Sequence, residues 1–149
     1  FKDKPAKAPF SSFDSVLPED LWTYLEIQRN QEGIDVFAIP HNSNVSDGWM
    51  FSERKFIGTP KNAQFASRNL GMTIDSRYAE RQQANEPLFE IHQTKGNSEA
   101  HPWLSPNDEF ANFEPFPSLI SLGTPSQIKG GFYRQGLVEG MKLESELGQ

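Results

Sequence analysis

Gly33-Ile34-Asp35-Val36-Phe37-Ala38-Ile39-Pro40-His41-Asn42 (residues 33–42) is the stretch that decides how the chain is expected to fold. Its apolar run from 34 to 39 is rich in β-branched and aromatic residues and ends at Pro40, which predicts a strand buried on both faces. The preceding segment starts with Pro18-Glu19-Asp20, a typical helix beginning, and Gly33 is its natural stop. A helix, a glycine and a buried strand make half of a βαβ unit, so an α/β fold is predicted.

Further along the chain, the sequence predicts two more helices and one more strand. Residues 75–85 predict a polar helix with Asp75 or Ser76 as N-cap, and residues 88–92 predict the strand. Residues 132–147 predict a helix whose apolar stripe is Leu137, Val138, Met141 and Leu147. Two strands are too few for a covered parallel sheet, so we expect their partner strands to lie outside this chain.

Composition excludes several classes of protein. The 149 residues carry 20 acidic and 14 basic side chains, a net charge of −6, and no Lys/Arg cluster, so nucleic acid is not an expected partner. The absence of Cys excludes disulfides, thiolate metal sites and a cysteine nucleophile. No apolar run is long enough for a membrane span. Gly and Pro, 11 of each, indicate many loops.

The predicted organisation is a single partial domain, residues 1–149, without internal repeats. Its segments are an irregular arm (1–17), a helix-strand-His motif (18–48), a long loop (49–74), a helix-strand pair (75–92), a loop-rich segment (93–128) and a C-terminal helix (129–149). A loop as long as 49–74 in a compact domain is usually functional.

His41 and Glu90 are the first candidates for a site. His41 ends the first predicted strand, where α/β folds place their ligands, and Glu90 and His92 project from one side of the second. If the two strands are parallel, Glu90 and His41 converge on one cleft. The alternatives stay open: an ordinary loop histidine at 41, a carboxylate paired with Lys or Arg at 90, and a core or rim histidine at 92.

The turn from 95 to 101 brings an acid, a base and an imidazole together in Lys95, Glu99 and His101. Glu99 and His101 are suitable donors for a divalent cation. A loop braced by its own hydrogen bonds is the other interpretation, and the spacing alone favours it. The chain has no glycine-rich phosphate loop, no HExxH and no GxSxG motif.

Five strings of the sequence resemble a large bacterial family of domains of unknown function that is placed in the PHP superfamily, named for polymerase and histidinol phosphatase. They are FSSFDS (10–15), PEDLW (18–22), AIPHNSNVSDG (38–48), YAERQQANEPL (78–88) and SEAHPWLSPNDEFANFE (98–114). The resemblance covers nearly the whole chain, and the last string is the most specific.

The resemblance implies a fold and a metal site. PHP domains are distorted, TIM-barrel-related β/α barrels with up to three metal ions, so the chain would be the central, loop-rich part of such a barrel. His41 matches a strand-terminal metal ligand of the superfamily, and Glu90 matches a strand-end carboxylate. The opening His-x-His pair is missing, and so are a strand-end Glu and His expected upstream of Phe1 and the Asp-x-His pair expected beyond Gln149.

The chain is therefore expected to be an internal fragment of a metal-dependent phosphoesterase that acts on a small phosphorylated or acidic substrate, and to be inactive alone. Zn²⁺, Mn²⁺ or Fe suits such ligands, although the fragment itself is not required to bind a metal. The cleft would be lined by Asn42, His92, Lys95, Glu99 and His101.

Two other functions remain open from the sequence. The chain would either be a non-catalytic module that binds an acidic or sugar-like ligand, with Trp49 and Trp103 as platforms, or a fragment without activity. In the latter case, cut barrel edges would drive self-association. Export of family members favours a periplasmic location.

Overall fold

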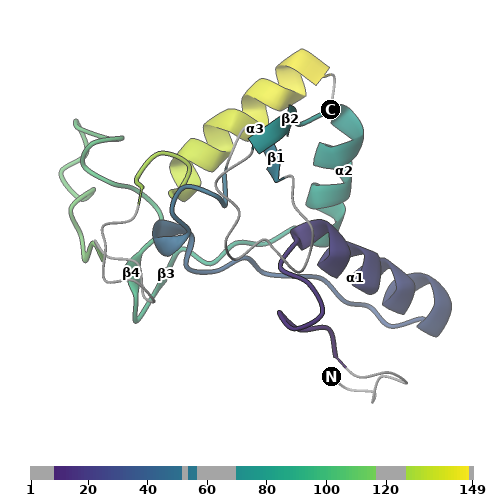
Figure 1. The fold of residues 1–149 in the computed structure, drawn as a ribbon. Coiled ribbons are helices and arrows are strands. Elements are labelled where there is room, and N and C mark those ends of the chain that lie inside the picture. Colours follow the sequence, from purple (N-terminus) through teal and green to yellow (C-terminus); the bar gives the residue numbers. More distant parts are fainter. Residues whose placement is uncertain (1–8, 52–53, 57–69, 117–126, 148–149) are drawn as a thin grey trace. The chain divides into compact units, whose positions relative to one another are not determined.

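The computed structural model describes residues 9–51, 54–56, 70–116 and 127–147. The chain divides into two compact units, which are described separately: unit 1 is residues 1–38 with 54–87, and unit 2 is residues 39–53 with 88–149. The elements, in chain order, are α1 (Pro18–Glu32), the 3₁₀ helix η1 (Ser43–Val45), β1 (Arg54–Phe56), β2 (Leu70–Thr73), α2 (Ser76–Asn85), β3 (His92–Gln93), β4 (Gly96–Asn97) and α3 (Tyr133–Leu147) (Figure 1).

The prediction that the chain forms the central part of a β/α barrel is wrong for the described residues. They form three α-helices and two separate sheets, each of two antiparallel strands. β1 pairs with β2 through a register irregularity between Lys55 and Phe56, and β3 pairs with β4 as a short hairpin. Neither sheet is parallel or closed, so cut barrel edges do not exist in this part of the chain.

The predicted strand 34–39 is not formed. The segment is extended, but no strand is assigned to it, and exposure alternates along it, with Phe37 44% and Ile39 49% exposed. The apolar run therefore has one exposed side rather than two covered faces. One backbone bond in this segment, from Ala38 N to Asn85 O at 2.8 Å, holds its end within unit 1.

The prediction of a second strand over residues 88–92 is also largely wrong. Only its last residue belongs to a strand, because β3 begins at His92 and pairs backwards with β4. Leu88, at the start of the predicted strand, is 53% exposed. In the predicted loop 49–74 the structure places β1 and β2, while 52–53 and 57–69 lie outside the described residues, as do 1–8 of the predicted arm.

In unit 1, the two helices begin and end where the local sequence signals predict. α1 has Pro18 in its first turn and ends at Gly33, which has φ 66°, a left-handed conformation that glycine adopts without steric cost. α2 is capped by Asp75, whose Oδ1 accepts the backbone N–H of Tyr78 at 2.8 Å. These predictions are confirmed.

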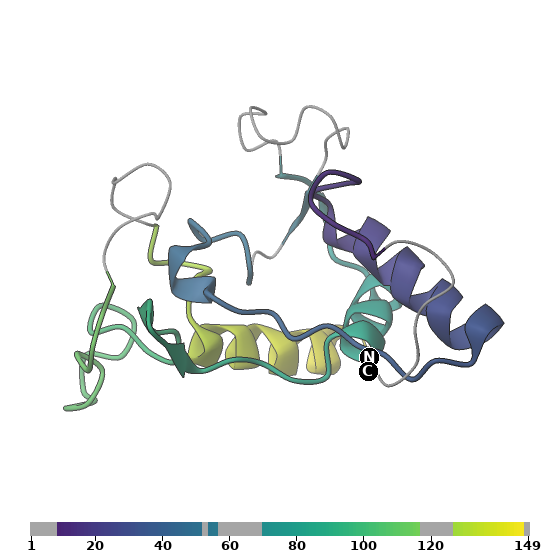
Figure 2. The ribbon, with the colours of Figure 1, turned by 90° about the horizontal axis from the view of Figure 1, so that it is seen from below.

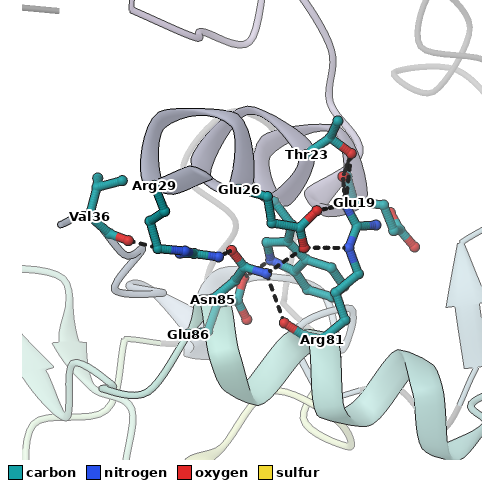
Figure 3. Close-up of polar contacts among 9 residues, drawn as sticks. Glu19, Thr23, Glu26, Arg29, Val36, Arg81, Asn85 and Glu86 are labelled. Atoms are coloured by element: carbon teal, nitrogen blue, oxygen red, sulfur yellow. Dashed lines mark hydrogen bonds and ion pairs between the residues drawn. The ribbon is translucent and has the colours of Figure 1, made fainter. Parts of the chain in front are cut away.

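The core of unit 1 lies where α1 meets α2 (Figures 1 and 3). Trp22 and Leu25, which are 1% and 4% exposed, form its apolar centre. The ring of Trp22 contacts the ring of Tyr78 edge-on at 5.1 Å, and the Arg81 guanidinium lies 5.7 Å from the centre of the Trp22 ring. Aromatic and cation–π contacts of this kind add to the area buried by the indole.

A polar network fastens the same two helices together (Figure 3). Asn85 has no exposed surface, and its Oδ1 accepts from Arg29 Nη2 at 2.6 Å while its Nδ2 donates to Glu26 Oε1 at 3.1 Å and to Arg81 O at 2.8 Å. Arg29 also donates to Val36 O at 2.8 Å, which ties the extended segment to α1. All hydrogen-bonding atoms of this buried amide are therefore satisfied.

In unit 2, aromatic side chains pack beside α3. Phe51, Phe89 and Tyr133 have ring centres 5.0 to 6.5 Å apart. An added Cβ at Gly136 would meet the Phe51 ring, whereas one at Gly140 would meet nothing within 4 Å. Of these two glycines, only Gly136 therefore lies at a close contact between α3 and a neighbouring side chain.

The N-terminal turn of α3 lies against the residues that follow β4 (Figure 2). Tyr133 N donates to Ser98 O at 2.9 Å and Arg134 N donates to Glu99 O at 3.1 Å. The expected apolar stripe of this helix is exposed: Leu137, Val138 and Met141 are 48%, 59% and 63% exposed, and the side chain of Leu147 lies outside the description. None of the helices in the described ranges has the length and apolar character needed to cross a membrane.

Candidate functional site

The segment around His41 is shaped by a left-handed asparagine. Asn42 has φ 57° and ψ 36°, a conformation that asparagine tolerates better than most residues, and it precedes η1. The turn leaves His41 exposed, and no hydrogen bond or ion pair joins its ring to the described part of the chain. An exposed imidazole without a partner is available to a ligand.

Glu90 lies beside this segment although the predicted pair of parallel strands is absent. Its backbone N–H donates to Pro40 O at 3.2 Å, one residue before His41. Its carboxylate Oε2 accepts from Gln93 Nε2 at 3.0 Å, and the same amide nitrogen donates to Asn42 Oδ1. Gln93 therefore connects the predicted site residues Asn42 and Glu90.

Lys95 joins the same cluster from the turn between β3 and β4. Its Nζ donates to Gln93 Oε1 at 3.0 Å, so Gln93 uses both ends of its amide, one toward Lys95 and the other toward Asn42 and Glu90. We call these four residues, Asn42, Glu90, Gln93 and Lys95, the Gln93 network. Gln93 was not among the predicted site residues, because it belongs to no motif of its own.

Buried polar residues hold η1 against the hairpin. Asn44 is 2% exposed; its Nδ2 donates to Lys95 O at 2.8 Å and its Oδ1 accepts from Ser98 Oγ at 2.9 Å. Ser43 has no exposed surface, and its Oγ has no partner among the described residues. None of these three residues was among the predicted site residues. Ser43 and Asn44 had a signal in the small polar run HNSN (41–44) directly after an apolar segment, whereas Ser98 lies outside that run.

The other predicted site residues have partners of their own, and none of these bonds reaches the Gln93 network. His92 Nε2 and Glu114 Oε2 are 2.8 Å apart. Glu99 Oε1 accepts from Arg134 Nη2 at 2.7 Å. Arg134 also pairs with Asp108, whose pKa is lowered first by the backbone N–H of Phe110 and then by this guanidinium.

His101 is held in one tautomer when it is neutral. Its Nδ1 accepts the backbone N–H of Trp103 at 3.2 Å, so the ring proton resides on Nε2. Its ring lies 5.3 Å from the ring of Phe132, and partial burial lowers its pKa. Nε2 would have to lose its proton to bind a metal ion, so the geometry does not favour the predicted ligand role.

The described residues do not complete a metal site. Among them, no three His, Cys, Asp or Glu side chains gather closely enough to hold an ion. His41 and Glu90 offer nitrogen and oxygen donors, the types that suit Zn²⁺, Mn²⁺ or Fe, but catalytic zinc sites normally use three protein ligands. A metal held by these two residues would need further ligands from outside the described ranges.

Comparison with known proteins gives a family but no activity. A family model described as a protein of unknown function (DUF3604) matches residues 1–149. No curated protein matches the chain, and no solved structure does.

Proposed function

Because the chain belongs to the DUF3604 family, whose function is unknown, we propose a function from its own residues: it forms part of a divalent-metal-dependent phosphoester hydrolase, with His41 and Glu90 as two of the metal ligands. The observation that carries this proposal is the position of Glu90, whose backbone is bonded to Pro40 beside the unpartnered, exposed ring of His41. An imidazole and a carboxylate, carried by segments that are joined at this backbone bond, are donors that such hydrolases use.

Two further features support a phosphorylated substrate at this place. The ammonium group of Lys95 belongs to the Gln93 network and offers a positive charge to a phosphoryl group. The PHP superfamily, to which five strings of the sequence are similar, hydrolyses phosphoesters; this support rests on the sequence alone. With two ligands instead of three or more, the chain alone is expected to bind metal weakly and not to hydrolyse phosphoesters.

Metal binding by the purified chain tests the proposal. We expect Zn²⁺ or Mn²⁺ titrated into the metal-free chain to bind at one site, and His41→Ala and Glu90→Gln each to weaken binding by about tenfold or more, as removal of one ligand should. His92→Ala is the matched control, since this imidazole is paired with Glu114, and it should leave the affinity unchanged.

The proposal is wrong if the chain binds no divalent ion, or if His92→Ala weakens binding as much as His41→Ala does. Hydrolysis of p-nitrophenyl phosphate is measured in parallel. The wild-type chain is expected to show no hydrolysis on its own; if it is active, equal activity of the metal-loaded His41→Ala and Glu90→Gln variants would also contradict the proposed ligand roles.

A non-catalytic binding module is the second candidate, favoured by Trp103. Its side chain is 81% exposed, so its flat indole ring is accessible to a ligand, whereas Trp49 is only partly exposed. The two candidates differ in one measurable property: a binding module retains its ligand after metal ions are removed with a chelator.

A further inference from the structure

A groove of about 580 Å³ opens beside the β3–β4 hairpin. One wall is formed by residues 92–94 and Gly96, and the other by residues 114–116. The groove is largely open to solvent, so a molecule bound in it would be covered on one side only. The groove is separate from the His41 and Glu90 pair, and only Gln93 belongs to both places.

The second wall is fixed to the hairpin by direct backbone packing. Asn97 N donates to Glu114 O at 3.0 Å, and Gly96, at φ 85°, lies so close that a Cβ there would be 2.6 Å from Glu114 O and 2.9 Å from Phe116 Cβ. Glycine is therefore required at this position for both its backbone angle and its contact. The groove is thus formed by two segments in direct contact, not by one loop alone.

The groove presents hydrogen-bond acceptors together with an aromatic ring. Glu114 contributes a carboxylate and pairs with His92 Nε2; when His92 is neutral and donates from Nε2, its Nδ1 is an acceptor. Thr94 Oγ1 donates to Gln93 Oε1 at 3.3 Å and keeps its lone pairs. Phe116, 37% exposed, supplies the ring, and Phe113 extends the aromatic surface with its ring 5.8 Å from that of His92.

We propose that this groove binds an organic ammonium ligand. A carboxylate and neutral acceptors suit a group that only donates, and the face of an aromatic ring attracts a cation. Among the residues that the structure describes, neither Lys nor Arg lines the groove, and the Nζ of nearby Lys95 is directed to Gln93. A phosphate would meet the Glu114 carboxylate without a Lys or Arg among the lining residues to balance it, so this groove is not suited to the phosphoryl group of the proposed substrate.

Cadaverine and spermidine, titrated into the isotope-labelled chain in the presence of a chelator, are the probes. We expect the backbone amide signals of residues 92–97 and 114 to shift, with glucose and inorganic phosphate giving no comparable change. Glu114→Gln should weaken binding about tenfold and Phe116→Ala severalfold. Glu109→Gln is the matched control, because this exposed acid on the same loop does not line the groove.

The proposal is overturned if neither amine shifts these signals, if glucose or phosphate shifts them equally, or if Glu109→Gln weakens binding as much as Glu114→Gln does. The amide spectrum of each variant shows whether it is folded. Because the chelator removes metal ions, failure of amine binding says nothing against the metal site, and failure of metal binding says nothing against the groove.

Discussion

The indole Nε1–H of Trp22 donates a 2.8 Å hydrogen bond to Glu86 Oε1, which places a carboxylate beside the apolar centre of unit 1. Burial raises the pKa of Glu86 above its ordinary value of 4.5, and the bonds from Trp22 and Gln82 oppose this effect only in part. The hydrogen bond thus joins α1 to the C-terminal end of α2, while burial of the negative charge on Glu86 disfavours folding.

Replacing Glu86 by Gln should not destabilise the chain at neutral pH and is expected to stabilise it. A raised pKa in the folded state contributes stability below pH 4.5, and this contribution is lost as pH rises through the folded-state pKa. Gln keeps an acceptor for Trp22 and carries no charge. Urea unfolding at several pH values measures this: the advantage of Glu86→Gln should be present at pH 7 and disappear below pH 4.5.

Glu26→Gln should have the opposite pH dependence. Its carboxylate accepts from Arg81 Nε at 2.7 Å and Arg81 Nη2 at 2.9 Å, and this pairing lowers its pKa below 4.5. The stability contributed by the charge is present above pH 4.5 and is lost as pH falls through the folded-state pKa. We expect a loss of about 1 kcal/mol at pH 7, because the pair is one-third exposed.

The same urea titrations check this prediction. Glu80→Gln, an exposed acid on α2, is the control and should unfold like the wild type. A Glu26→Gln variant whose loss of stability persisted unchanged in acid would contradict the assignment to the ion pair.

Asn85→Ala should be among the most destabilising single changes in unit 1. The change removes the fully buried Asn85 amide, to which Arg29 Nη2 donates and from which Glu26 Oε1 accepts, so both groups lose this partner. We expect a loss of about 3 kcal/mol in the free energy of unfolding. Asn30→Ala, an exposed position on α1, provides the comparison, and equal losses for the two variants would show that the buried network is not the cause.

Two glycines on α3 should respond oppositely to the same change. A Cβ at Gly136 would lie 2.4 Å from the Phe51 ring, so Gly136→Ala should cost about 1–3 kcal/mol through overpacking. Gly140 faces open space, and Gly140→Ala should raise stability by about 0.5–1 kcal/mol because alanine favours the helix. Thermal unfolding of both variants tests this pair, and a stabilising Gly136→Ala would contradict the packing.

The helices could be predicted from the sequence because their signals are local. Pro18 and Gly33 bound α1, and Asp75 caps α2, through interactions with residues at most a few positions away. The segment 34–39 was misinterpreted because an apolar run is compatible both with a covered strand and with an extended segment that has one exposed side. Exposure of Phe37 depends on what covers it, which the run itself does not specify.

The convergence of Glu90 and His41 on one cleft, expected if their strands were parallel, stays a prediction, because the structure joins only the backbones of the two segments. Two parallel strands were predicted, whereas a single bond between Glu90 N and Pro40 O joins the segments. The role of His41 and Glu90 as metal ligands stays a prediction. Gln93 was missed because its importance comes from contacts with residues 51 and 3 positions away, which no spacing rule identifies.

The amide of Gln93 also has an electrical consequence. It stands between an ammonium group on Lys95 and a carboxylate on Glu90, and hydrogen-bonds to both. Within the described residues neither Lys95 nor Glu90 forms an ion pair, so each charged group is bonded to a neutral amide and not to an opposite charge. Both charges therefore stay available to an incoming molecule.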